Sequence, residues 1–241
     1  MPTHLYCLLA AGSDATPPTN VGVDVRALVV GDVVAWVSTV DTDRLTREGR
    51  AAASEAVRHD RVVSQALARN ITPMPATLAD RYAADADVVA DVAGRSVEVK
   101  AALQRIAGLV EMAVIIAPAT HTADQKAEEV AGGPGRKYLE QLRDRPSRLN
   151  DVASRIDTAV ESISRDTRRR VERDRIGLSH LVRLADIDPY RTLVLGFASG
   201  DYRLVVDGPR APYSFASFVP NRPALRDEPS GHETGRLDRE K

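Results

Sequence analysis

The sequence predicts an α+β protein in which two α/β units are followed by a C-terminal tail. Three observations lead to this fold class. Short runs rich in β-branched residues are bounded by Gly- and Pro-containing turns, which is typical of strands. Longer segments between them place apolar residues three or four positions apart, as amphipathic helices do. The last residues, 221–241, are poor in apolar side chains and show no period, so we expect a disordered tail.

The first unit is expected to span residues 1–108. Its first strand is the continuous apolar run His4–Ala11. Two β-rich runs, residues 27–30 and 33–40, flank Gly31-Asp32, a dipeptide that is typical of a hairpin turn.

Two helices follow in this unit, on either side of an extended segment. Glu48–Asn70 has an apolar face, and Asn70 suits a helix end. Ile71–Thr77 contains two prolines, which favour extended backbone before them. Asp85–Ala107 is expected as one helix with a weak point at Gly94, ended by Gly108.

The second unit is expected to span residues 109–220. A strand at 110–117 and a polar loop precede a helical region from Arg136, whose apolar spacing predicts a long amphipathic helix reaching about Arg175. The remaining expected elements are a strand at 178–185, a short helix at 190–198 and a strand at 202–206. This β-α-β-α-β order is close to a ferredoxin-like split βαβ arrangement.

The stretch Leu204–Phe215 is expected to organise the second unit. It opens as a strand, turns at Asp207-Gly208-Pro209, and then presents Tyr213 and Phe215. We expect these aromatic side chains to close a core against the sheet of the second unit. A corner that stacks on a ligand is the alternative.

Trp36 is the only tryptophan, and it lies in a strand that is apolar on both faces. Val34, Trp36 and Val40 point to one side of Val33–Val40, and Val33, Ala35 and Val37 point to the other. Either the chain covers both faces, or one face waits for another protein. Because Trp is enriched at the energetic centres of interfaces, Trp36 is the candidate partner-contact residue.

The composition disfavours several classes of protein. The 33 basic and 34 acidic residues nearly cancel, whereas a general nucleic-acid binder is usually basic. The single cysteine, Cys7, excludes an internal disulfide framework and a cysteine-based zinc cluster. No signal peptide and no apolar run of about 20 residues is present, so we expect a cytoplasmic protein without a membrane span.

No recognised catalytic motif occurs in the chain. His59-Asp60 is the best candidate pair, but neighbouring helix residues do not face each other. Cys7 lies in a strand expected to be buried, where a thiol is usually inert. Gly132–Gly135 lacks the Lys-Ser/Thr ending of a phosphate loop. We therefore assign no catalytic, cofactor-binding or metal-binding residue, and expect no cofactor.

Several short motifs resemble those of the gas vesicle GvpL/GvpF family. Gly208-Pro209 through Pro212-Tyr213-Ser214-Phe215 is similar to the family's closing GPWPPYSF, with Arg210 and Ala211 in place of Trp and Pro. The other matching motifs lie, in order, in HLYCLLAA from His4, at His59 with Val62-Val63, at Pro73-Met74, at Glu111 and at Gly135-Arg136-x-Tyr138-Leu139. Pro75, Ala76 and Met112 depart from the family pattern.

The resemblance implies a non-enzymatic protein with two ferredoxin-like α/β domains that acts in gas vesicle assembly. Its implied partners are the hydrophobic major shell protein and other accessory proteins of the gas vesicle, with which it would associate in the cytoplasm. Two other classes stay open: an enzyme on a ferredoxin-like scaffold, and an RNA-binding module that uses an open sheet.

Overall fold

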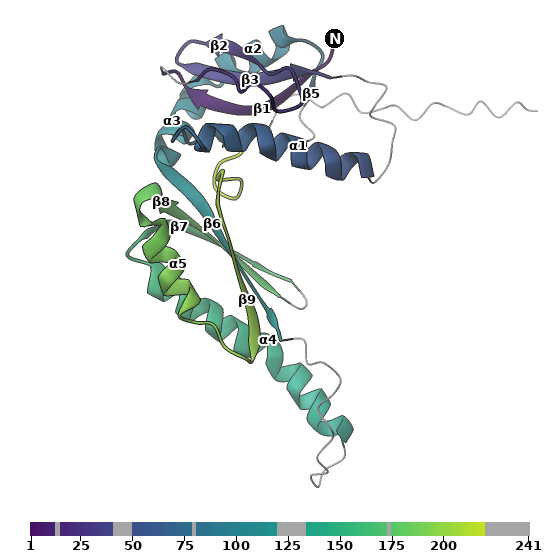
Figure 1. Ribbon diagram of the computed structural model, residues 1–241, viewed down its shortest axis with the longest axis vertical. Helices are drawn as coiled ribbons and strands as arrows, with labels where there is room; N and C mark the ends of the chain where they lie inside the picture. Colours follow the sequence, from purple (N-terminus) through teal and green to yellow (C-terminus); the bar gives the residue numbers. More distant parts are fainter. Residues whose placement is uncertain (13–14, 41–49, 79–80, 120–133, 173–174, 220–241) are drawn as a thin grey trace, which may run out of the picture.

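The computed structural model describes residues 1–12, 15–40, 50–78, 81–119, 134–172 and 175–219. It is a mixed α+β structure with two separate antiparallel sheets (Figure 1). The predicted disordered tail at 221–241 lies outside the described residues. The division into domains 1–108 and 109–220 stays a prediction, although the first sheet lies before residue 83 and the second begins at Leu109.

The first sheet has the strand order β2-β3-β1-β4, with β5 also paired to β1. Its strands are β1 (Thr3–Ala10), β2 (Arg26–Val30), β3 (Val33–Thr39), β4 (Met74–Pro75) and β5 (Arg81–Tyr82). The β2–β3 hairpin pairs Val30 with Val33 across the predicted two-residue turn. Gly31 has a φ of 59°, a conformation that costs glycine little and explains the turn residue.

Three helices cover the first sheet on its two faces. They are α1 (Arg50–Leu67), α2 (Asp85–Gly94) and α3 (Ser96–Ile106). Val62, Val63 and Ala66 of α1 pack with Tyr6 and Trp36, whereas buried residues of α2 and α3 pack with Leu5, Leu8 and Val37. In Figure 1, α1 lies between the first sheet and the second.

Three positions at or within the predicted helices can be compared with the structure, and one of them differs from expectation. The single helix expected at 85–107 is interrupted between Gly94 and Ser96, at the position where glycine weakens a helix. Asn70 and Gly108 have φ values of 60° and 71°, and each follows a helix end as expected.

The second sheet has the strand order β7-β8-β6-β9 and is antiparallel throughout. In chain order its elements are β6 (Leu109–Pro118), α4 (Pro134–Val160), β7 (Ser164–Val171), β8 (Ile176–Arg183), α5 (Ile187–Leu195) and β9 (Tyr202–Arg210). Both helices lie on one side of this sheet (Figure 1). Their buried residues, among them Ile156, Val160 and Tyr190, pack on Met112, Val114 and Leu178.

The expectation of a helix reaching Arg175 is wrong. The helix α4 ends at Val160, and residues 164–171 form the edge strand β7, paired with β8 from Val171↔Ile176 onward. Beyond Ile163 the sequence offers Val171 as the next apolar helical position, so few apolar side chains would anchor another two turns. Pairing with β8 satisfies the backbone of these residues instead, and tertiary context overrides a weak helical pattern.

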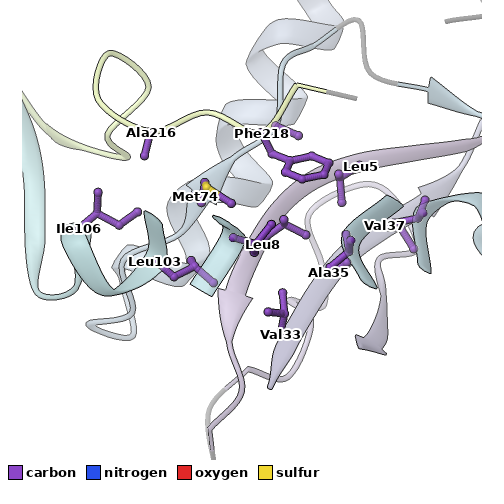
Figure 2. Close-up of a cluster of buried hydrophobic side chains, with 14 of the residues drawn as sticks. Leu5, Leu8, Val33, Ala35, Val37, Met74, Leu103, Ile106, Ala216 and Phe218 are labelled. Atoms are coloured by element: carbon purple, nitrogen blue, oxygen red, sulfur yellow. The ribbon is translucent and has the colours of Figure 1, made fainter. Parts of the chain in front are cut away.

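Residues 211–219, hereafter the closing segment, return from the second sheet to the first. Phe215, Ala216 and Phe218 are buried in the same cluster as Leu5, Leu8 and Leu103, and Figure 2 shows Phe218 and Ala216 beside these residues. Tyr213 packs instead against the cluster that holds Trp36 and α1. The sequence predicts that Tyr213 and Phe215 bury against the second sheet. Leu109 and Leu181 of that sheet belong to the same cluster as Phe215, but most of that cluster comes from the first unit.

Candidate functional site

The candidate site is the junction at which the closing segment joins the two sheets. Backbone bonds attach it to the first sheet, where Phe218 N donates to Pro75 O at 2.9 Å and Ala76 forms a parallel bridge with Phe218. Arginines of α3 and of the residue before it donate to its carbonyls, Arg105 to Phe215 O at 3.1 Å and Arg95 to Val219 O at 2.7 Å. The segment is thus held along most of its length.

Glu111 of β6 attaches the same segment to the second sheet. Its side chain is fully buried. The backbone N–H of Ser214 donates to Oε2 at 2.8 Å, and Ser214 Oγ donates to Oε1 at 2.7 Å. Oε1 also accepts from Ser179 Oγ at 2.9 Å and from Arg210 Nη2 at 2.6 Å. A buried carboxylate is stable only with such partners, so this cluster specifies where the closing segment sits.

Chain geometry at Gly208 brings Arg210 to Glu111. Gly208 has a φ of 115°, and the Gly208-Pro209 peptide bond is cis. A Cβ at Gly208 would lie 2.8 Å from the carbonyl oxygen of Glu111 and 3.0 Å from the sulfur of Met112. Glycine is therefore required for β9 to approach β6 this closely, and Gly208 of the closing motif has a structural role.

A histidine pair lies in the core under α1. His4 Nε2 and His59 Nδ1 are 3.0 Å apart, and both rings are buried next to Tyr6. Burial lowers the pKa of His59 to about 4. At neutral pH His59 is therefore a neutral imidazole that shares one hydrogen bond with His4, a structural arrangement rather than a poised base.

Asp60 does not orient His59. Its carboxylate lies 3.5 Å from the hydroxyl of Tyr213 on the closing segment. Burial, together with that carboxylate, raises the pKa of Tyr213 and keeps its hydroxyl protonated. The sequence pair His59-Asp60 thus splits into a core histidine and a carboxylate that faces the closing segment, as the argument from helix geometry anticipated.

A second buried histidine links α4, α5 and the second sheet. Nε2 of His180 donates to Asp157 Oδ1 at 2.9 Å, and Tyr190 Oη lies 2.8 Å from Nδ1. Arg169 of β7 approaches the other oxygen of Asp157 at 2.5 Å. Burial lowers the pKa of His180 and raises that of Tyr190, so both side chains are favoured in their neutral forms.

Two hollows adjoin the closing segment. The larger, about 590 Å³, lies between α3 and the closing segment and is lined by Arg95, Arg105 and Phe218, among others. The smaller, about 390 Å³, is lined by Ala56, His59, Leu78 and Tyr213 and is largely apolar. Within the described residues no group of three His, Cys, Asp or Glu side chains is placed to hold a metal ion.

The other residues singled out from the sequence have structural surroundings. Trp36 is fully buried, and its Nε1 donates to Ala15 O at 2.9 Å. Both faces of β3 are covered within the chain, so a partner contact through Trp36 stays a prediction that would require its cover to move. Cys7 is buried, which raises the pKa of its thiol. The motif residues Gly135, Arg136 and Tyr138 lie where no side chain is described.

Glu111 was visible in the sequence only as a motif residue, and its partners were not predicted. Ser179, Arg210 and Ser214 lie 68, 99 and 103 residues from Glu111. No spacing rule connects such distant positions. The one local signal that could have indicated the cluster is an acidic residue inside the strongly apolar run 109–118, since such a run is expected to be buried.

One family model matches nearly the whole chain, and two solved structures share its fold. The model of the family described as "Gas vesicle synthesis protein GvpL/GvpF" matches residues 2–217. The gas vesicle protein GvpF from Anabaena sp. PCC7120 has a similar crystal structure, with a TM-score of 0.69 at 14% identity over 90% of this chain and 98% of that one. GvpF from Microcystis aeruginosa gives 0.68 at 12% identity, over 90% and 99% of the chains. No curated protein sequence matches.

Proposed function

Because this chain belongs to the GvpL/GvpF family of gas vesicle synthesis proteins, we propose that it acts in gas vesicle assembly by binding the hydrophobic shell protein and other accessory proteins. The match over residues 2–217 is the observation that supports this role most. It includes both sheets and the closing segment up to Ser217. The proposed place of action is the cytoplasm, at growing gas vesicles.

The proposal treats the protein as a binding scaffold rather than a catalyst. Its buried His180 and Glu111 are hydrogen-bonded to partners within the chain, and Nδ1 of His59 lies 3.0 Å from His4 Nε2. None of the helices in the described part has both the length and the hydropathy needed to cross a membrane. Rigid sheets joined by a specified junction suit a protein that presents surfaces to several partners at fixed positions.

We also propose a ferredoxin-like assignment for the second unit. Its element order β6-α4-β7-β8-α5-β9 and the antiparallel strand order β7-β8-β6-β9, with both helices on one side, support this assignment. The first unit supports such an assignment less directly, because three strands precede α1 and two helices follow one another after β5.

An RNA-binding module is the second candidate, and the second sheet disfavours it. An RNA-binding sheet stacks bases on exposed aromatic side chains of its central strands. The residues that point away from the helices on β6 and β8 include Ala113, Ile115, Gly177 and Ser179, none of which is aromatic.

The test is a vesicle-forming host from which the gene for this chain is removed and then restored. We expect buoyant vesicles to be lost on removal and to return with the wild-type gene, scored by flotation and electron microscopy. Affinity purification of the tagged chain from the restored strain is expected to retain the shell protein or an accessory protein. Normal vesicles without the gene, together with no co-purifying gas vesicle protein, would refute the proposal.

A further inference from the structure

The second sheet has one face that no described helix covers. Strand alternation turns Met112, Val114 and Ile116 of β6 towards α4 and α5, so the intervening residues point the other way. We call this side the open face. Away from the end that the closing segment covers, it is formed by Ile115, Gly177, Arg170 and Val205. Ser179 and Ala113 lie towards the covered end, where Ser214 Oγ donates to Ser179 Oγ at 3.2 Å.

The strand register arranges these residues in rows. Arg170 pairs with Gly177, Gly177 with Ile115, and Ile115 with Val205, so one row crosses all four strands. The neighbouring row runs from Arg168 through Ser179 and Ala113 to Asp207. Ala113, Gly177 and Ser179 therefore form a shallow floor with arginines on β7 at one side. At the other side lie Ile115 of β6 with Val205 and Asp207 of β9.

The accessible apolar part of this floor is the row through Gly177, Ile115 and Val205, because Ala113 in the neighbouring row is only 7% exposed. Ile115 is 38% exposed, although it lies on a central strand where side chains are usually covered. A Cβ added at Gly177 would meet only the backbone oxygen of Arg170, at 3.9 Å, so there is free space above it. The sheet thus offers apolar area that the described part of the chain does not use.

Basic side chains lie on both edges of the open face, and the acidic Asp207 on β9 is paired with Arg210 at 3.6 Å. Arg170 of β7 is largely exposed, and its guanidinium forms an ion pair with Glu172 at 3.2 Å. On the opposite edge Arg203 of β9 lies beside Ala117 and forms no ion pair with any residue that the structure describes. Arginines at the border of an apolar surface favour a partner that brings carboxylates to the same positions.

We propose that the open face binds an amphipathic α-helix of another gas vesicle protein, whose apolar side is bordered by Asp and Glu. Resting on the proposed function, this inference names the surface and the chemistry of the partner. A helix is about 10 Å across and four strands spaced about 4.8 Å apart make a floor that can seat it between the two edges. Apolar packing supplies the attraction, and the arginines set the orientation.

Photo-crosslinking in vesicle-forming cells tests the surface. Benzoylphenylalanine replaces Ile115 or Val205 in the full-length chain, and exposed Val29 or Val97 in matched controls on the first unit. We expect crosslinks from positions 115 and 205, but not 29 and 97, to a helical segment bordered by acidic residues, identified by mass spectrometry. Crosslinks only within the chain, to a second copy or to a basic segment, or none at all, would overturn the inference.

Charge reversal tests the orientation of the partner. Arg170→Glu with Arg203→Glu is compared with Arg61→Glu and Arg148→Glu, which change the same charge at exposed positions on α1 and α4. Arg168 is left in place because its guanidinium lies 5.8 Å from the ring centroid of Phe215. We expect the open-face pair to reduce crosslinking from position 115 at least about tenfold at unchanged melting temperature, and the control pair to leave it unchanged.

The results separate this inference from the proposed function. If deletion of the gene abolishes vesicles but the open-face pair crosslinks and assembles normally, the protein acts in assembly through another surface and the inference is wrong. If vesicles form without the gene, the proposed function fails irrespective of the crosslinks.

Discussion

Glu111 is the residue on which the junction between the two sheets depends most directly. Its buried carboxylate accepts bonds from the closing segment, from β8 and from Arg210. Replacing it by Gln keeps the shape but removes the charge and turns an amide N–H₂ towards existing donors. Breaking a buried, hydrogen-bonded ion pair costs about 3–5 kcal/mol, so we expect Glu111→Gln to lower the free energy of unfolding by roughly that amount.

Urea unfolding at pH 7 measures this effect. Glu98→Gln is the matched control, because Glu98 pairs with Arg95 at 3.0 Å but is 68% exposed. An exposed pair contributes at most about 1 kcal/mol. Equal effects of the two substitutions would show that the Glu111 cluster does not stabilise the junction.

Trp36 lies in the core of the first unit, as in the alternative in which the chain itself covers both faces of its strand. Because its ring is fully buried and its Nε1 donates to Ala15 O, we expect Trp36→Ser to cost about 3–5 kcal/mol of stability. Thermal melting followed by circular dichroism measures this cost, and a pull-down of the shell protein runs beside it. A variant that melts normally but no longer binds the shell protein would restore Trp36 as a partner contact.

His59 should make the fold sensitive to mild acid. Its pKa is about 4 in the folded chain against 6.5 when unperturbed, so between these values the unfolded state takes up the proton more readily. Stability is therefore complete above about pH 6.5 and falls as the pH is lowered, by about 2 kcal/mol at pH 5. The lowered pKa of His180 acts in the same direction.

Unfolding free energies of the wild type and His59→Gln at pH 7.5 and pH 5 test this. Gln can keep a hydrogen bond to His4 without titrating, so the variant should lose less stability on acidification. An identical loss in both proteins would assign the acid sensitivity to other groups.

At the scale of elements, the closing segment is the feature whose placement most differs from expectation. It leaves β9 in the second sheet and buries Phe215 and Phe218 in the core of the first unit. Phe215→Ala should therefore cost about 3–5 kcal/mol, the range for a buried aromatic. Val219→Ala, at the exposed end of the same segment, is the control and should change stability by less than about 0.5 kcal/mol.

The measurement is again urea unfolding, with one addition. If the segment joins both sheets, Phe215→Ala should lower the stability of the whole chain in one transition. Separate transitions with the first unit unaffected would mean that the segment belongs to the second sheet alone.

The strand β7, at the edge of the second sheet, could not be predicted from its own residues. SRDTRRRV alternates no apolar side chains, and its charges are typical of a solvated helix face as much as of an edge strand. What decides between them is β8, which offers a complete row of backbone partners beginning at Ile176. The charges of the strand are then those expected of an edge that must not pair with other chains.

For the whole molecule, the C-terminal residues beyond 220 are the part expected to be dispensable for folding. Their composition offers too little apolar area to offset the entropy of ordering. A chain ending at Pro220 should melt within about 1 °C of the full-length protein, because surface changes of this kind alter stability little. A clear drop in melting temperature would show that the tail packs on one of the sheets.

Features that depend on a few neighbouring residues could be predicted from the sequence. The hairpin at Gly31, the helix ends at Asn70 and Gly108, and the weak point at Gly94 all depend on the conformational freedom of one residue. The α+β class followed from periodicities of two and 3.6, and the family resemblance from short motifs in the right order. Each of these signals is local, so it survives without any knowledge of what packs on it.

Tertiary structure alone decided the rest. The cover over Trp36, the strand identity of residues 164–171, the return of the closing segment to the first sheet and the partners of Glu111 all join positions far apart in the chain. Such contacts form because buried area and hydrogen bonds made across the whole molecule outweigh the small preferences of single residues. For the same reason the open face of the second sheet is a property of the folded protein: its row from Arg170 to Val205 exists only once four strands are in register.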